Sequence, residues 1–118
     1  MLIDHDVRDD AVVVSVDGEI DSGTIDEFSA YLMTALSVAS SHPARLLVVN
    51  LQDITFFGSA GMNAVLSCHE RGLSNQTMVR LVADQRAVVR PLQLTNLDTV
   101  LALYPSEAAA LNPDDTPA

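Results

Sequence analysis

Apolar and polar residues follow one another along the chain in two patterns, which predict strands and helices in turn. Val12, Val14 and Val16 share one face of a segment with a period of two, which is typical of a strand. Residues 46–49 are apolar at every position, and a strand without alternation is covered on both faces. The predicted strands are Leu2–Val7, Ala11–Val16, Leu46–Leu51, Thr77–Val82 and a short edge strand at Thr99–Leu103.

Turn residues mark the ends of the first two strands. Arg8, Asp9 and Asp10 predict a tight turn that joins these strands in a hairpin. Asp17 and Gly18 predict the end of the second strand. Residues 19–24 are then expected to form a loop before the first helix.

Apolar residues three or four positions apart predict four helices. The first begins after Thr24, which with Glu27 fits a capping box, and it stops at residues 40–43. The third begins at Asp84, contains Pro91, and is followed by Asn96 in a left-handed turn. The fourth spans residues 105–111.

The second helix is predicted to run from about Gly58 to Arg71, with Gly72 as its C-terminal cap. The side chains expected on its inner face are Met62, Val65, Leu66, His69 and Leu73. Cys68 falls about 100° away from that face, at the rotation per residue of a helix, so partial exposure of its thiol is expected.

This order of elements predicts an α/β fold, with a small mixed sheet of four to five strands and about four helices packed against it. The chain of 118 residues is long enough for one domain with a sizeable core. We expect that single domain to span residues 1–111, followed by a flexible polar tail at 112–118.

The composition of the chain excludes some classes of binding partner. The net charge is −10, which argues against nucleic acid and against an anionic membrane surface. No apolar run reaches the length of a membrane-spanning helix, so no membrane insertion is expected. With one cysteine an internal disulfide is excluded, and a cytoplasmic location is the simplest expectation.

The sequence matches none of the catalytic or cofactor-binding motifs considered below. Gly-x-Ser-x-Gly fails around Ser59, because Phe57 stands at the first position of the motif. Dinucleotide and Walker-type glycine patterns are absent, and His and Cys residues lack metal-ligand spacing. The sequence therefore predicts no enzyme, no cofactor and no metal site. Cys68 is interpreted as an inert residue, with a redox switch as the less favoured alternative.

The junction between the apolar strand at 46–51 and the second helix carries the candidate site. Ser59 stands in the first turn of that helix among the small residues Gly58, Ala60 and Gly61. The N-terminal end of a helix dipole favours an anion. Ser59 is thus a candidate for modification or for docking of another protein, although a simple helix-start serine is the more ordinary interpretation.

Four segments together resemble the STAS domain, and in particular bacterial anti-sigma factor antagonists. They are GEID at Gly18–Asp21, LLVVNLQDITF at Leu46–Phe56, SAG at Ser59–Gly61 and VVRPLQLTNLDTVLALYPS at Val88–Ser106. The resemblance covers about residues 2–111, and its strength lies in the order and spacing of the segments rather than in any one of them.

The resemblance implies a function. Such an antagonist binds an anti-sigma factor, which is a serine kinase of the histidine-kinase-like ATPase type, and frees its sigma factor. Phosphorylation of the residue matching Ser59 switches binding off. The family aspartate before that serine is replaced here by Gly58, whereas the aspartate of the family's GELD segment is kept as Asp21. Asn96 replaces a family glycine.

We expect a docking patch on two segments. Met62 or Phe57 is the expected apolar anchor. The predicted partner-binding residues are Asp21, Ser22, Gly23, Thr24, Phe57, Gly58, Ser59, Ala60, Gly61 and Met62. A second copy of the chain is a further candidate partner. The alternatives are a STAS subunit or scaffold of another complex, such as a lipid-transport ATPase or a stress-signalling assembly, and a small-molecule sensor domain.

Overall fold

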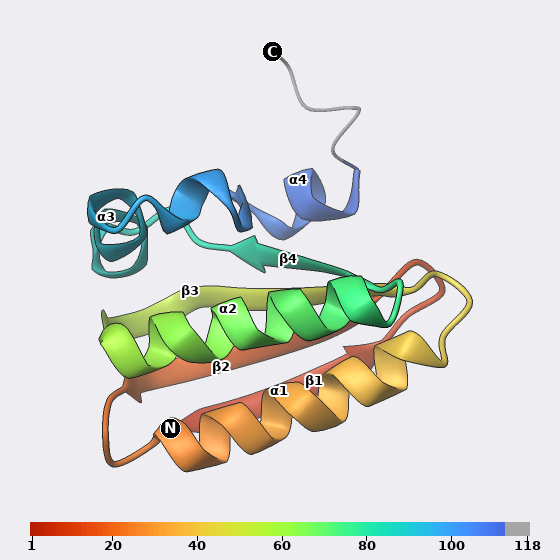
Figure 1. Ribbon diagram of the computed structural model, residues 1–118, viewed down its shortest axis with the longest axis horizontal. Coiled ribbons are helices and arrows are strands. Elements are labelled where there is room, and N and C mark those ends of the chain that lie inside the picture. The colour runs from red at the N-terminus through yellow and green to blue at the C-terminus, as the bar shows by residue number, and fades with distance from the viewer. Residues whose placement is uncertain (113–118) are drawn as a thin grey trace.

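A computed structural model describes residues 1–112 of the chain (Figure 1). The elements in chain order are β1 (Leu2–Val7), β2 (Val12–Ile20), α1 (Ile25–Ser40), β3 (Leu46–Phe57), α2 (Ser59–Ser74), β4 (Met78–Val82), α3 (Arg86–Leu94), a short 3₁₀ helix (Leu97–Thr99), β5 (Ala102–Tyr104) and α4 (Glu107–Leu111). Apart from Asn112, the predicted polar tail lies outside the described residues.

The five strands form one mixed sheet whose spatial order, β1-β2-β3-β4-β5, follows the chain. β1 and β2 pair antiparallel, and the Arg8 amide donates to the Ala11 carbonyl at 2.8 Å to close the turn between them. The other three pairs are parallel. The predicted hairpin and the mixed α/β sheet are confirmed.

β3 is the centre of the sheet, as its apolar run predicts. Val48 and Val49 are both fully buried, on opposite faces. The strand is longer than expected, because it continues beyond Leu51 to Phe57. The helix after it is thereby placed at the far end of a twelve-residue strand.

β2 corrects the expectation that Asp17 and Gly18 end the second strand. It runs on to Ile20 because two register shifts, around Ser15/Asp17 and Gly18/Glu19, keep it paired with β3. Gly18 has a φ of +118°, a conformation that side chains rarely adopt. The predicted loop at 19–24 therefore shrinks to the residues between Ile20 and Ile25.

The core has two parts, one on each face of the sheet. α1, α2 and α3 bury the larger cluster, which includes Phe28, Val65 and Leu92. Figure 1 shows α1 and α2 side by side along the sheet. On the other face α4 contributes Ala110 and Leu111 to a smaller cluster.

Helix ends differ from the expectations in two places. Gly72 is not the C-terminal cap of α2: it lies inside the helix and is buried, and Asn75 follows the last turn. α3 begins after Gln85 rather than Asp84. The Gln85 side chain is engaged elsewhere, since its amide donates to the Leu51 and Ile54 carbonyls of β3. Asn96 adopts the predicted left-handed conformation, with φ of 59°.

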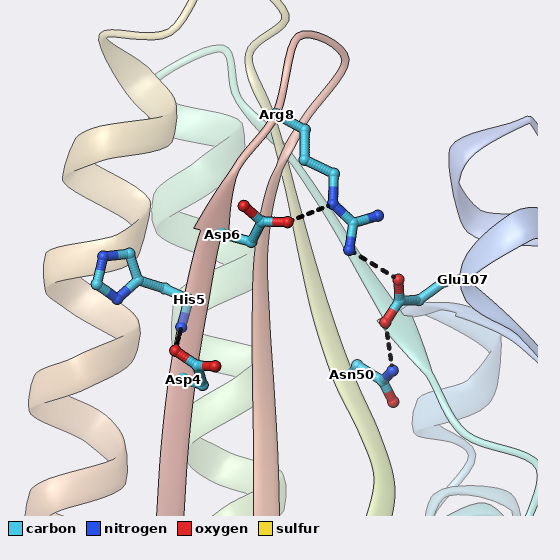
Figure 2. Close-up of polar contacts among 6 residues, drawn as sticks. All are labelled: Asp4, His5, Asp6, Arg8, Asn50 and Glu107. Carbon is cyan, nitrogen blue, oxygen red and sulfur yellow. Dashed lines mark hydrogen bonds and ion pairs between the residues drawn. The ribbon is translucent and has the colours of Figure 1, made fainter.

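A chain of polar contacts links the hairpin to α4 (Figure 2). The Arg8 guanidinium contacts Asp6 at 2.8 Å and Glu107 at 3.3 Å, and Glu107 accepts from the Asn50 amide at 2.6 Å. These groups raise the pKa of Arg8, chiefly through the hydrogen bond to Asp6. The first hairpin, the central strand and the last helix are thus joined on the face opposite α1 and α2.

Candidate partner-binding site at the start of α2

The ends of β2 and β3 bring the two predicted segments together. Ile20 lies opposite Phe57 in the sheet, and the Gly58 amide donates to the Ile20 carbonyl at 3.3 Å. The loop that begins at Asp21 therefore starts beside the residue that precedes α2. As the sequence predicts, residues 21–24 and 58–62 share one end of the molecule.

Asp21 and Thr24 organise the loop before α1. Asp21 is half-buried, and its Oδ1 accepts from the Gly23 amide at 2.9 Å. The Thr24 hydroxyl accepts from the Asp21 amide at 3.0 Å and donates to the Glu19 carbonyl at 2.8 Å. Because that hydroxyl faces back into the loop, the predicted capping box of Thr24 with Glu27 is wrong.

Asp21→Ala should lower the free energy of unfolding by about 0.5–1.5 kcal/mol, because the loop loses a side-chain acceptor. Asp21→Asn keeps an acceptor oxygen at that position and should lose less. Urea unfolding of both variants measures the difference. If the alanine variant is as stable as the parent, Asp21 acts only at the surface.

Ser59 lies where the sequence predicts, exposed in the first turn of α2. Gly58 precedes it in an extended conformation, with φ of −86° and ψ of −178°. The first turn reads Ser59, Ala60, Gly61 and Met62, so it contains no carboxylate. The N–H groups of a first helical turn have no partners within the helix, and their dipoles favour a negative charge at this point.

Two residues predicted for the docking patch belong to the core instead. Phe57 is 3% exposed, so the prediction that it serves as an apolar anchor is wrong. Gly61 is also buried: a Cβ there would lie 2.8 Å from Ile20 Cγ2 and 2.9 Å from the Phe57 ring. Its small size serves the packing of α2 on the sheet rather than the approach of a partner.

Phe56 is the aromatic residue that reaches the surface, with 51% of its area exposed. The β3 register places it one residue before Phe57 and on the opposite side of the strand. Sequence reasoning missed it because the buried residues of this part of β3, Leu51, Ile54 and Phe57, do not follow a period of two. Met62, the other predicted anchor, is half-buried, and its sulfur lies 3.7 Å from the Thr95 hydroxyl.

Phe56 also limits the space for a side chain at position 58, where the family has an aspartate. A Cβ on Gly58 would lie 3.1 Å from Phe56 Cε2, which is tighter than an ordinary contact. Since the φ of Gly58 suits any residue and the Phe56 ring is half exposed, the ring can move aside. A side chain at position 58 is thus sterically feasible.

A shallow groove of about 360 Å³ lies between α1 and α2 next to the site. It is lined by Ser29, Met33, Ala60, Asn63, Ala64, Ser67 and Arg71. Apart from Ala60, these residues were not predicted as part of the site. They come from two helices, and the sequence alone does not show that α1 and α2 lie side by side.

Cys68 is fully buried, so the expectation of partial exposure is wrong. The inner face of α2 is formed by Gly61, Val65, Cys68 and Gly72. Leu73, which was predicted on that face, is 65% exposed. Burial raises the pKa of the Cys68 thiol from 9.0 to about 12. A buried and protonated thiol is a poor nucleophile, which disfavours the redox alternative.

The raised pKa predicts a loss of stability in alkali. The unfolded thiol loses its proton above about pH 8.5, whereas the folded thiol keeps it until about pH 12. The contribution of Cys68 is therefore complete below pH 8.5 and declines by up to about 1.4 kcal/mol per pH unit above it. Urea unfolding at pH 8 and pH 10 should show a steeper decline for the parent protein than for Cys68→Ala. Equal slopes would contradict the assignment.

The described residues were also searched for a metal-binding site and for a membrane-spanning helix. Within residues 1–112, no group of three or more His, Cys, Asp or Glu side chains is arranged to hold a metal ion. No helix in that range is long and apolar enough to cross a bilayer.

Comparisons with known proteins agree with this fold. The STAS domain family model matches residues 3–110. RsfA of Mycobacterium tuberculosis, an anti-sigma-F factor antagonist, is 34% identical over 110 residues, which cover 89% of this chain and 80% of RsfA. An anti-sigma factor antagonist from Mycobacterium paratuberculosis superposes with a TM-score of 0.85 at 30% identity, covering 95% of this chain and 92% of that one. Unphosphorylated SpoIIAA shares the fold, with a TM-score of 0.74 at 18% identity and 96% of both chains covered. The chain therefore belongs to the STAS domain family and, within it, to the anti-sigma factor antagonists.

Proposed function

We propose that this protein binds an anti-sigma factor through the surface around Ser59 and thereby frees a sigma factor. The observation that carries the proposal is the similarity to RsfA over nearly the whole chain, together with an exposed serine at the start of α2. As a member of the antagonist family the chain is a regulatory protein and not an enzyme. Its place of action is the cytoplasm, where sigma factors and their inhibitors meet.

The proposed surface has a small number of accessible contributors. Ser22, Gly23 and Ser59 are exposed, and Gly58 and Ala60 are partly so. Phe56 takes over the anchoring role for which Phe57 is too deeply buried. The groove between α1 and α2 extends this surface along the helices. A partner that places an apolar side chain near Phe56 and backbone near Gly58 would also approach Ser59, which follows Gly58 in the chain.

Phosphorylation of Ser59 by a kinase of the histidine-kinase-like ATPase type is the proposed switch. A phosphate adds about −1.5 to −2 charges. Exposed Glu19 and half-buried Asp21 lie on the neighbouring segment, so the added charge increases an existing negative field. Burying that charge against a partner without a matching cation weakens the complex. SpoIIAA, which shares the fold, has been solved in a phosphorylated form.

Gly58 sets the expected rate of that reaction. Without the family carboxylate beside the acceptor hydroxyl, the kinase must orient Ser59 through its own groups. Gly58→Asp supplies a carboxylate at the cost of displacing the Phe56 ring. We expect phosphorylation of Gly58→Asp to be faster than that of the parent, and Gly58→Asn to resemble the parent because it adds similar bulk without charge.

The test combines the protein with a candidate anti-sigma kinase and ATP, followed by mass analysis of the intact chain and its peptides. A single phosphate on Ser59, absent in Ser59→Ala, and release of the kinase on phosphorylation would support the switch. Tight binding that persists with ATP and without phosphate would retain the antagonist and overturn the switch. Failure to bind anti-sigma factors of this type at all would overturn the proposed function.

A further inference from the structure

β1 is an edge strand, and its outer side is open in the described structure. The hydrogen bond between Arg8 and Ala11 makes that pair the closing pair of the hairpin. Because bonded and non-bonded pairs alternate along an antiparallel ladder, Asp6 and Asp4 bond to β2. The amides and carbonyls of Ile3, His5 and Val7 therefore point outward, to the open edge.

One contact supports this assignment directly. The His5 amide donates to the Asp4 side chain at 2.9 Å, as Figure 2 shows, rather than to β2. A local side chain thus satisfies an outward amide that a partner strand could use. Open strand edges are sites for pairing with another chain, and charged residues such as Asp4 oppose pairing with strands that lack a matching charge.

A cavity lies next to this edge, between the hairpin and the second half of α1. Its volume is about 180 Å³, and its lining residues are His5, Val12, Tyr31, Thr34, Ala35 and Val38. His5 Nδ1 and the Tyr31 hydroxyl form a hydrogen bond of 2.6 Å at its wall. Small-molecule sites usually measure roughly 300–1,000 Å³. The cavity is smaller than that and suits a single apolar side chain.

The two faces of β1 carry different side chains and would contact different groups of a partner. His5 points to the face that α1 covers, so the neighbouring Asp4 and Asp6 point to the opposite face. All three residues are exposed. A strand added along the edge would place one side chain beside the cavity and its two neighbours beside the aspartates. A basic residue at the position beside Asp4 would match its charge, whereas Asp6 already contacts the Arg8 guanidinium at 2.8 Å.

We propose that β1 and α1 form a second docking site, which takes an extended segment of another protein in which a basic residue adjoins an apolar one. The segment adds a strand to the sheet through Ile3, His5 and Val7. Its apolar side chain occupies the cavity beside Tyr31 and Val38. Main-chain bonds supply affinity, and the cavity with Asp4 supplies selectivity, as in other cases of strand addition.

A second copy of this chain fits the same edge poorly when the two His5 residues lie opposite each other. Antiparallel pairing of two β1 strands about His5 would set Asp4 of one copy opposite Asp6 of the other, on both sides of the axis. Like charges directly opposite each other destabilise a strand pair. The charge pattern therefore disfavours self-association in the register centred on His5.

The site is separate from the Ser59 surface. Val12 and Val38, which line the cavity, lie at the start of β2 and near the end of α1, whereas Ser59 follows the end of β3. β2 and β3 run parallel, so the starts of both strands lie at one end of the sheet and their ends lie at the other (Figure 1). Both sites can be occupied at once, which would let the protein hold a second partner while it binds an anti-sigma factor.

The test uses a blocked synthetic peptide, about as long as β1, that alternates arginine with valine and carries leucine at its centre. Titration followed by NMR should show binding and slower hydrogen exchange at the Ile3, His5 and Val7 amides, with none at Gly58 or Ser59. N-methylation at the central residue should weaken binding about tenfold, since it removes a main-chain donor.

Two variants test the side-chain contacts, each with a matched control. Val38→Arg, at a position 44% exposed, should abolish binding, while Val100→Arg, at a position 52% exposed between the 3₁₀ helix and β5, should not. Asp4→Asn should weaken binding several-fold, while Asp98→Asn, which removes an exposed charge elsewhere, should not.

Three results would overturn the proposal. The first is no binding at millimolar peptide, and the second is binding that is indifferent to N-methylation and to Val38→Arg. The third is self-association of the protein that protects the same three amides, because the occupant would then be a second copy. None of these results touches binding of an anti-sigma factor at Ser59, so the two proposals fail independently.

Discussion

Replacing Ser59 with glutamate should weaken binding of a cognate anti-sigma factor about a hundredfold, equivalent to roughly 3 kcal/mol. The substitution puts a permanent carboxylate on an exposed position beside Glu19 and Asp21, where a docked partner would bury it. Ser59→Ala removes only a hydroxyl and should bind as the parent does. Calorimetry or surface plasmon resonance with the purified partner measures both.

The matched control for this substitution is Ser67→Glu. Ser67 is also an exposed serine of α2, about two turns further along. It lines the groove between α1 and α2, so a modest loss there would show how far the interface extends. Equal losses for both glutamates would mean that the interface reaches Ser67 as fully as Ser59, so that Ser59 holds no special position in it. Circular dichroism establishes that both variants keep the fold.

Gly72→Ala should cause a larger loss of stability than any other glycine-to-alanine change in α2 or its cap. A Cβ on Gly72 would lie 2.6 Å from the Thr77 carbonyl oxygen and 2.9 Å from Val79 Cγ2. The carbonyl belongs to the backbone, and the Thr77 amide donates to the Gly72 carbonyl at 2.7 Å, so relief requires moving the whole turn. Overpacking of this kind costs about 1–3 kcal/mol.

Gly58→Ala provides the comparison, since its added carbon meets only the half-exposed Phe56 ring within 3.4 Å. That change should alter the free energy of unfolding by less than about 0.5 kcal/mol. Urea unfolding midpoints distinguish the two. Should both variants unfold at the same midpoint, the turn between α2 and β4 is more adaptable than its contacts indicate.

Much of the sheet was predictable because a buried strand consists mainly of apolar residues. The unbroken apolar run at 46–49 identified the central strand, and the turn at Arg8–Asp10 identified the hairpin. The exposure of Ser59 was predictable for a similar reason, because small residues on both sides cannot cover it. The roles assigned to the site residues remain proposals.

The extension of β2 was not predictable from local signals. Asp17 and Gly18 form a strong turn signal, yet pairing with β3 carries the chain through them. A register shift absorbs the irregularity at each step, and Gly18 supplies the unusual φ. Tertiary pairing of this kind overrides propensity, which acts only on the nearest residues.

The inner face of α2 was misassigned because large apolar residues were taken as the guide to burial. The structure buries Gly61, Cys68 and Gly72 around Val65, which lets the helix lie close to the sheet and to α1. Leu73 is left exposed as a result. Small residues carry little hydropathy, so only the packing of neighbouring elements reveals them as an inner face.

The spatial order of the sheet has a consequence for how the chain folds during synthesis. Each strand pairs with the one made just before it, so the sheet can grow strand by strand as the ribosome releases the chain. The cluster of Ala11, Val13, Val48 and Val82 is the exception, because Ala110 of α4 completes it. That apolar face stays bare until α4 emerges. We therefore expect chaperones to bind a nascent chain halted before Glu107. Once α4 has been made, the contact between Arg8 and Glu107 can form, and we expect the chaperone to dissociate.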